Sequence, residues 1–240
     1  MIGLFKTLIS LLLWPIWLSF FVPSLFILFL LIFIIPRKYY HYIVRPVCWI
    51  YCFLAGQILI RENQPPPLEG QPYLYLFNHV SMFDQFMVGA FVPHYITAIG
   101  AEEIFKYPVW GQLIKRYGAI PIKRKRLKSA LKSLGLVEDA IKKGISFIIA
   151  PEGTRTLDGE MGVFKKGPFH IAKNTGITIV PIALIGAFEA KRKDDWKLMP
   201  GTITTRFGSP IRKEEYENLS VEEIRDLTRN KIKKLIKEGI

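Results

Sequence analysis

Residues 73–84, which read YLYLFNHVSMFD, decide the fold of this chain. Tyr73–Phe77 form an uninterrupted apolar run of the length and composition of a buried strand. From Met82 to Phe91 the pattern changes to one typical of a helix. A strand followed by a turn and a helix is the building unit of an α/β sheet. We therefore expect His79 to lie in the turn at the end of a strand.

His79 and Asp84 are five positions apart, and they can meet if the chain turns into a helix between them. The carboxylate would then hold one imidazole nitrogen and leave the other facing a substrate hydroxyl, which makes the histidine a general base. A histidine on its own is usually structural, but Asp84 at this offset favours a site. Ser81 offers a nucleophile instead. No G-x-S-x-G turn surrounds it, so direct attack by the substrate is preferred.

A second motif follows a second apolar run, Ile145–Ala150, and reads Pro151-Glu152-Gly153-Thr154-Arg155. It is therefore expected at the same kind of strand end. Arg155 is a fixed cation suited to a phosphate group. Glu152 either accepts a hydrogen bond from a substrate hydroxyl or braces the loop through backbone amides, and the sequence leaves both roles open. Gly153 permits close backbone approach. The two motifs together indicate acyl transfer onto a hydroxyl of a phosphorylated lipid.

The chain beyond residue 60 alternates strand-like and helix-like segments, which predicts an α/β fold with a mixed sheet covered by helices. The last helix is expected to open with a capping box formed by Ser220 and Glu223. The predicted strands are Ile58–Arg61, Tyr73–Phe77, Tyr95–Gly100, Ala119–Ile122, Ser146–Ala150, Thr178–Leu184 and Thr202–Phe207, and the predicted helices are Met82–Phe91, Pro108–Arg116, Leu127–Lys142, Lys166–Thr175 and Val221–Lys237.

The first 60 residues differ in composition from the rest. Residues 7–36 and 46–60 carry no charged side chain, and no acidic residue occurs before Glu62. This segment is too long for a signal peptide and has no small-residue cleavage site, so we expect a retained membrane element. The predicted division is 1–60 for a membrane-associated helical hairpin and 61–240 for the catalytic domain.

Two membrane arrangements are compatible with this segment. A helix of 30 residues would be about 45 Å long, beyond a hydrocarbon core of about 30 Å, and Pro15 and Pro23 should each bend or break it. Two full crossings would place the basic turn between the segments opposite the catalytic domain, against the positive-inside tendency. A hairpin embedded in one leaflet, with the domain on the cytoplasmic face, is favoured over a single crossing.

The charge balance points to anionic partners. The net charge is +13, with 33 Lys and Arg against 20 Asp and Glu. A basic domain beside a membrane suits anionic headgroups and phosphate-bearing substrates. Nucleic acid is disfavoured because no nucleic-acid module is recognisable. Cys48 and Cys52 have no second ligand pair and poor disulfide spacing, so we expect two buried thiols and no metal site.

Four blocks in order resemble the glycerolipid acyltransferases, specifically the lysophosphatidic acid acyltransferase (PlsC-type) family. Asn78-His79 with Asp84 resembles the first block, and Gly118–Arg124 (GAIPIKR) is similar to the second. Pro151–Arg155, followed by Phe164–Gly167 (FKKG), matches the third, and Val180–Ala183 (VPIA) resembles the fourth. The blocks cover roughly residues 70–190. Pro121 departs from a regular strand because it lacks a backbone donor, so its strand is expected at an edge or to end there.

The resemblance implies transfer of a fatty acyl group from a coenzyme A or acyl-carrier-protein thioester to the sn-2 hydroxyl of lysophosphatidic acid, without metal or organic cofactor. It implies His79 as base with Asp84 behind it. Arg124 and Arg155 are the expected phosphate clamps, although Arg124 lies in a basic run that is also compatible with a solvated patch. The further substrate-binding candidates are Glu152, Gly153, Thr154, Lys106 and Lys165.

Two rival hypotheses remain. One is acylation of another acceptor, glycerol 3-phosphate or a different lysophospholipid, which the short chain makes less favoured than lysophosphatidic acid. The other is a catalytically silent membrane scaffold that uses only the hairpin and the basic surface. The presence of His79, Asp84, Glu152, Gly153 and Arg155 argues against the scaffold.

Overall fold

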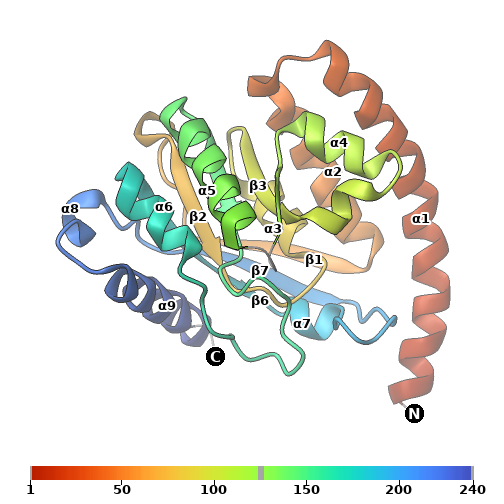
Figure 1. Cartoon of the computed structure of the whole chain (residues 1–240). Coiled ribbons are helices and arrows are strands. Elements are labelled where there is room, and N and C mark those ends of the chain that lie inside the picture. Colours follow the sequence, from red (N-terminus) through yellow and green to blue (C-terminus); the bar gives the residue numbers. More distant parts are fainter. Residues whose placement is uncertain (1, 124–126, 239–240) are drawn as a thin grey trace.

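The computed structural model describes residues 2–123 and 127–238 and contains one seven-stranded sheet (Figure 1). The strand order is β1-β7-β6-β2-β5-β3-β4. All neighbouring strands pair in parallel except β6 and β7, so the sheet is mixed, as predicted. The strands are β1 (Gln57–Glu62), β2 (Tyr73–Phe77), β3 (Ile96–Ala101), β4 (Ile120–Ile122), β5 (Ser146–Ile149), β6 (Thr178–Ile185) and β7 (Gly201–Phe207).

Strand β2 lies at the centre of the sheet, and all five of its side chains are buried. Successive side chains of a strand point to opposite faces. Tyr73, Tyr75 and Phe77 accordingly enter one hydrophobic core, and Leu74 and Leu76 enter another. A strand that is covered on both faces has no polar position, which explains its apolar sequence.

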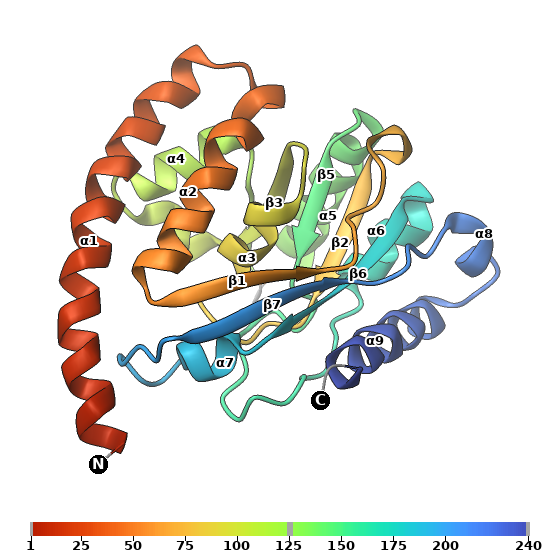
Figure 2. The ribbon, with the colours of Figure 1, turned by 180° about the vertical axis from the view of Figure 1, so that it is seen from behind.

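Helices form a layer on each face of the sheet (Figures 1 and 2). On one face α2 (Tyr40–Leu54) and α3 (Asp84–Phe91) cover the sheet, with α1 (Ile2–Ile34) lying outside them. The other face is covered by α5 (Leu127–Lys142), α6 (Gly167–Thr175) and α9 (Val221–Lys237). The predicted fold class, an α/β sheet covered by helices, is thereby confirmed.

Most element bounds agree with the predicted ones within two residues. The short helices α7 (Ala187–Ala190) and α8 (Lys213–Tyr216) were not predicted, and neither were the 3₁₀ turns, because one turn carries no periodic pattern. Helix α4 (Trp110–Tyr117) begins two residues later than expected. Strand β4, which contains Pro121, is an edge strand, as its missing backbone donor requires. Ser220 and Glu223 form the expected capping box of α9.

Of the two outcomes expected at Pro15 and Pro23, a bend or a break, helix α1 excludes the break, because it continues through both residues. The helix is held on both sides of each proline by contacts with the rest of the chain. Ser10 exchanges hydrogen bonds with the backbone of Leu198, and the Trp17 indole donates to the Tyr51 carbonyl at 2.9 Å. Beyond Pro23, the Tyr40 hydroxyl donates to the Ile32 carbonyl at 2.7 Å. Such packing maintains a helix across prolines that would break an isolated one.

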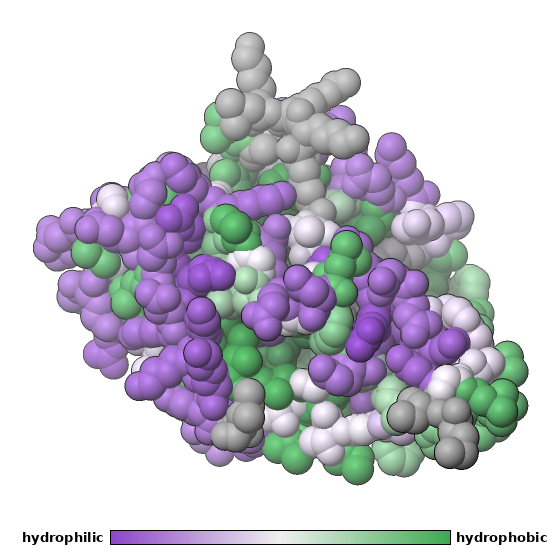
Figure 3. Space-filling model, turned by 90° about the horizontal axis from the view of Figure 1, so that it is seen from below, coloured by the Kyte–Doolittle hydropathy of each residue, from purple (hydrophilic) through white to green (hydrophobic). Residues whose placement is uncertain are grey.

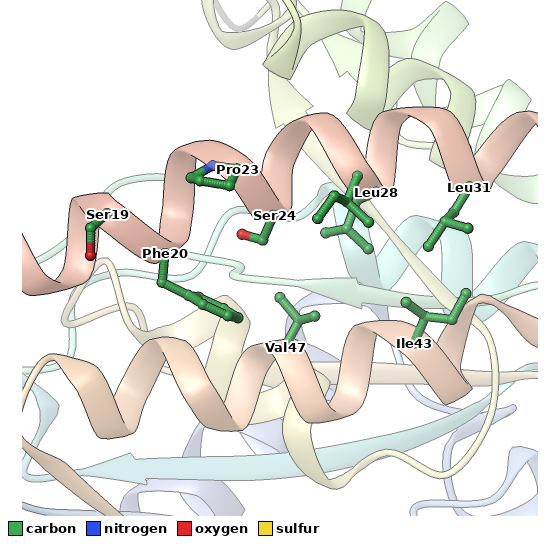
Figure 4. Close-up of a pocket in the computed structure, with 9 residues that line it drawn as sticks. Ser19, Phe20, Pro23, Ser24, Leu28, Leu31, Ile43 and Val47 are labelled. Carbon is green, nitrogen blue, oxygen red and sulfur yellow. The ribbon is translucent and has the colours of Figure 1, made fainter.

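Helices α1 and α2 lie side by side, joined by the turn η1 (Arg37–Tyr39). They are joined closely to the part of the chain that forms the sheet. Helix α2 packs on α3 and β1, and β1 begins at Gln57, before the predicted boundary at residue 61. An apolar groove of about 240 Å³ lies between α1 and α2, lined by Pro23, Ser24 and Leu28 on one side and Ile43 and Val47 on the other (Figure 4).

The outer surface of α1 is apolar along its whole length. Gly3–Ile34 is long and apolar enough to cross a membrane, and few of its residues are buried. Its exposed large apolar side chains include Leu4, Phe5, Leu8, Leu11, Leu12, Leu18, Phe26, Leu30 and Phe33, and Trp49 and Phe53 of α2 are exposed as well. An exposed apolar surface of this extent marks a membrane or protein contact.

Candidate active site

The residues of the first and third sequence blocks meet at one edge of the sheet. His79 follows β2, and Glu152 follows β5, its parallel neighbour. The carboxyl ends of parallel strands point to the same edge, where α/β sheets place their ligands. This edge faces down in Figure 1, and Figure 3 views it directly, with hydrophobic and hydrophilic surface interleaved across it.

The His79 imidazole is held by the Asp84 carboxylate. The Nδ1–Oδ2 distance is 2.7 Å. Asp84 is the first residue of α3, and its carboxylate also accepts the backbone amides of Val80 at 2.8 Å and Ser81 at 3.0 Å. The loop therefore wraps around the carboxylate and brings residues five positions apart into contact. The His79 side chain is 27% exposed, whereas that of Asp84 is 1% exposed.

Burial is the main influence on the ionisation of Asp84. It raises the pKa of the carboxyl, and the hydrogen bonds from His79, Ser81 and Val80 oppose that rise. The carboxylate is thus shielded from water and has the imidazole as its ionisable partner. An imidazole held in this way keeps its orientation and is stabilised when it takes up a proton.

Glu152 fastens the two loops together. Its Oε1 accepts the backbone amide of His79 at 2.7 Å, and its Oε2 accepts the amide of Gly162 at 2.9 Å. The residue is 6% exposed, and burial raises the pKa of its carboxyl. Of the two roles left open by the sequence, this geometry favours bracing, because both oxygens are engaged by backbone amides.

The loop that follows Glu152 also forms a hydrogen bond with the His79 backbone. The Thr156 amide donates to the His79 carbonyl at 2.9 Å, so both peptide groups of His79 are held by residues 152–156. Gly153 has a φ of +71°, and a Cβ there would lie 2.9 Å from the Lys165 Nζ. Glycine is therefore favoured both by the backbone conformation and by the approach of Lys165. Arg155 is half-buried at the same edge.

Asn78 and Ser81 have structural contacts on either side of His79. The Asn78 side chain donates to the Leu184 carbonyl at 2.9 Å and accepts the Leu184 amide at 2.8 Å, which ties the loop to β6. The Ser81 hydroxyl is buried and donates to the Lys191 carbonyl at 2.9 Å. Its oxygen is thus directed toward a backbone acceptor at the far side of α7.

Of the predicted residues, one makes no hydrogen bond to this cluster within the described part of the chain, and another lies outside that part. Lys106 ends the 3₁₀ turn η3 (Glu102–Lys106) after β3 and is exposed. Within residues 2–123 and 127–238, no hydrogen bond connects it to His79 or Asp84. Arg124 lies outside the described residues. Its neighbour Lys123 forms an ion pair with Glu102 at 2.9 Å.

The residues that follow β6 were not predicted from the sequence as part of the site. Lys191 and Lys193 lie beyond α7, and the Lys193 Nζ donates to the Thr154 hydroxyl at 2.9 Å. The available signal was the run Lys191-Arg192-Lys193 shortly after the fourth block. A basic run alone does not indicate which site it borders. The described residues contain no group of three or more His, Cys, Asp or Glu side chains arranged for a metal ion.

The family model described as Acyltransferase matches residues 57–185. A curated relative from Cocos nucifera, named 1-acyl-sn-glycerol-3-phosphate acyltransferase, is 35% identical over 175 residues, covering 70% of this chain and 57% of the relative. A relative of the same name from Pseudomonas aeruginosa is 31% identical over 186 residues, covering 74% of this chain and 70% of the relative. The chain spans about half the length of the first curated relatives that it matches.

A solved structure shares the fold. The crystal structure of the 1-acyl-sn-glycerophosphate (LPA) acyltransferase PlsC from Thermotoga maritima superposes with a TM-score of 0.81, covering 97% of both chains at 22% identity. The family model covers more than half of this chain and includes both loops of the site. On these matches, the chain belongs to the acyltransferase family of enzymes, as the sequence blocks implied.

Proposed function

We propose that this protein transfers a fatty acyl group from a thioester to the sn-2 hydroxyl of lysophosphatidic acid, giving phosphatidic acid. The observation that carries the proposal is the His79–Asp84 pair, with Nδ1 bonded to the buried carboxylate and the ring partly exposed. The relatives named above provide the choice of acceptor. The donor is an acyl-coenzyme A or an acyl-carrier protein, since both carry the same thioester.

In the proposed mechanism, His79 removes the proton of the acceptor hydroxyl through Nε2, the ring nitrogen opposite the Asp84 contact. The oxygen forms a bond to the thioester carbonyl carbon, and the carbon–sulfur bond then breaks. The leaving thiolate takes the proton back from the imidazolium, so the base is regenerated. Asp84 stabilises the imidazolium in between. A positioned general base of this kind contributes roughly 10²–10⁴-fold to the rate.

Ser81, two residues after His79, is the candidate nucleophile for a covalent route, and its geometry argues against one. Its hydroxyl is buried and donates to the Lys191 carbonyl. An activated serine donates its proton to the base that attacks with it. Direct attack by the acceptor, with no acyl-enzyme, is therefore the proposed route.

Arg155 is the proposed holder of the acceptor phosphate. The further candidates are Lys165, whose Nζ approaches Gly153 of the same loop, Lys106 and Arg124. Arg155 lies on the loop whose other residues bond to the His79 backbone. A phosphate bound to Arg155 would be held at a defined position relative to His79, because the same loop is hydrogen-bonded to the His79 backbone. Precise placement of reacting groups supplies much of the rate enhancement of such reactions. Glu152 and Gly153 support this loop, and Thr154 is its exposed neighbour.

For the membrane element, we propose that α1 and α2 lie in one leaflet at the cytoplasmic face. Contacts between α1 and the sheet-forming part of the chain run from Ser10, which exchanges hydrogen bonds with Leu198, to Ile32, which shares a buried cluster with Leu113 of α4. At 1.5 Å per residue, that stretch spans about 33 Å, slightly more than a hydrocarbon core of about 30 Å. A helix that crossed the bilayer could not keep the domain beside it over this length. An in-plane hairpin with its apolar side exposed fits these contacts.

The test is a direct assay of the purified full-length protein in mixed micelles. Palmitoyl-coenzyme A or palmitoyl-carrier protein is supplied with lysophosphatidic acid, and phosphatidic acid is measured by mass spectrometry. We expect product with at least one donor and its loss in the His79→Ala variant. Absence of product with both donors, while glycerol 3-phosphate or another lysophospholipid is acylated, would overturn the proposed acceptor.

A further inference from the structure

The segment Lys191-Arg192-Lys193 borders the site from the side opposite to the Glu152–Arg155 loop. It follows α7, which itself follows β6, the parallel neighbour of β2 on that side. The segment is bonded to both site loops. The Ser81 hydroxyl donates to the Lys191 carbonyl at 2.9 Å, and the Lys193 Nζ donates to the Thr154 hydroxyl at 2.9 Å.

This segment brings three cations together, and two acids, Asp194 and Asp195, follow them directly. The Lys191 side chain is buried, and its ammonium donates to the carbonyls of Arg192, at 2.6 Å, and Asp195. Burial lowers the pKa of Lys191, and the nearby positive charge of Arg155 lowers it further, against the opposing effect of Asp194 and Asp195. Neighbouring cations repel each other, and an anion bound between them offsets that repulsion.

The other cations of the segment are available to a ligand. Arg192 and Lys193 are exposed, and within the described residues neither they nor Arg155 takes part in an ion pair. Asp195, two residues after Lys193, forms an ion pair with Lys6 of α1 at 3.3 Å. The Arg192 guanidinium lies 5.0 Å from the Phe188 ring centroid, a cation–π contact that fixes its position above α7.

We propose that Lys191, Arg192 and Lys193 form, with Arg155, a phosphate-binding wall of the active site. This inference rests on the proposed function and extends it, because it assigns a second source of cations to substrate recognition. The group bound is a phosphate, and the acceptor headgroup and the coenzyme A of the donor both carry one. Lys191 is a positioning residue within this wall, because its buried ammonium holds the backbone of the segment in place. Arg192 and Lys193 are the residues that contact the phosphate.

The experiment compares Arg192→Gln and Lys193→Gln with Lys142→Gln, which removes the same charge at the end of α5, next to the opposite edge of the sheet. We expect the KM for one phosphorylated substrate to rise about tenfold in the first two variants, with kcat within twofold, and the control to match the wild type. A rise for lysophosphatidic acid assigns the wall to the acceptor. A rise for palmitoyl-coenzyme A, but not for palmitoyl-pantetheine, assigns it to the donor. An unchanged KM for both overturns the inference.

A second readout does not require turnover. Inorganic phosphate should raise the melting temperature of the wild type above its value in chloride at equal ionic strength, because a ligand that binds the folded state stabilises it. The rise should be smaller in Lys193→Gln and intact in Lys142→Gln. Equal rises in melting temperature in all three proteins would overturn the proposed phosphate-binding wall. If the wild type has no acyltransferase activity but its melting temperature still rises more than that of Lys193→Gln, only the proposed reaction is overturned.

Discussion

His79 is fixed by its backbone as well as by its side chain. Its amide donates to Glu152, its carbonyl accepts from Thr156, and its Nδ1 contacts Asp84. Removal of the imidazole leaves the two backbone contacts in place. The fold of the loop should therefore tolerate the loss of the ring, which allows the chemical role of the ring to be tested separately.

The first prediction concerns the rate. His79→Ala should lower kcat at least a hundredfold, because the contribution of a general base is about 10²–10⁴-fold. Steady-state kinetics in mixed micelles would measure the loss, with circular dichroism as the check on folding. The matched control is His170→Ala, since His170 is an exposed histidine on α6. A folded His79→Ala protein with near-normal kcat would refute the assignment of the base.

The second prediction concerns pH. Burial already raises the pKa of Asp84 above its ordinary value of 3.8, and removal of His79 takes away the largest opposing influence. A carboxyl with a raised folded-state pKa stabilises the fold at low pH and loses that contribution as pH rises through the folded-state value. The melting temperature of His79→Ala should therefore fall further below that of the wild type at pH 8 than at pH 5.

Thermal unfolding at a series of pH values would measure this difference. The double variant His79→Ala, Asp84→Asn carries no carboxyl at the position and serves as the control. Its deficit relative to the wild type should depend less on pH. A deficit in His79→Ala that is the same at pH 5 and pH 8 would show that Asp84 does not titrate in this range.

At the scale of elements, local sequence patterns predicted the strands and the long helices. They did not predict contacts between residues that are far apart in the sequence. The run Tyr73–Phe77 identified the central strand because burial on both faces leaves a purely apolar pattern. The offset between His79 and Asp84 could be interpreted because it is short. The bond from Glu152 to the His79 amide and that from Lys193 to Thr154 depend on strand order, which the sequence did not specify. The unbroken α1 likewise depends on tertiary packing that offsets its two prolines.

The third prediction tests the connection between α1 and the site. Ser10 is buried, and its oxygen accepts the amide of Leu198, at the end of the segment that follows the basic wall. Ser10→Ala would leave that amide without a partner, at a cost of about 1–3 kcal/mol in the free energy of unfolding. The melting temperature should fall, and hydrogen exchange in residues 191–199 should become faster.

Ser19→Ala is the control for this variant. The Ser19 hydroxyl is exposed and bonds only within α1, to the Ile16 carbonyl. Its replacement should change stability by less than about 0.5 kcal/mol. Equal hydrogen exchange of residues 191–199 in Ser10→Ala and Ser19→Ala would mean that α1 does not hold this segment.

At the scale of the whole molecule, the N-terminal helices are part of the folded body. Cys48, Tyr51 and Cys52 of α2 are buried in the same core as Phe83 and Met87. Deletion of the first 60 residues would expose that core and remove most of β1, so such a truncation would confuse loss of the fold with loss of membrane binding. Substitutions on the exposed surface of the hairpin avoid this problem.

The fourth prediction uses that surface. Leu11, Leu30 and Phe53 are 59%, 64% and 70% exposed, so Lys at these positions disturbs no core. If the hairpin lies in a leaflet, the triple Lys variant should lose most of its binding to vesicles of phosphatidylcholine and phosphatidylglycerol, measured by cosedimentation. Its added positive charge would by itself strengthen binding to an anionic surface, so a loss can come only from the apolar contact.

The control carries Lys at Leu131 and Leu136, which are 57% and 50% exposed on α5, across the sheet from the hairpin. The control should bind as the wild type does, and equal binding by the two variants would refute the in-plane hairpin.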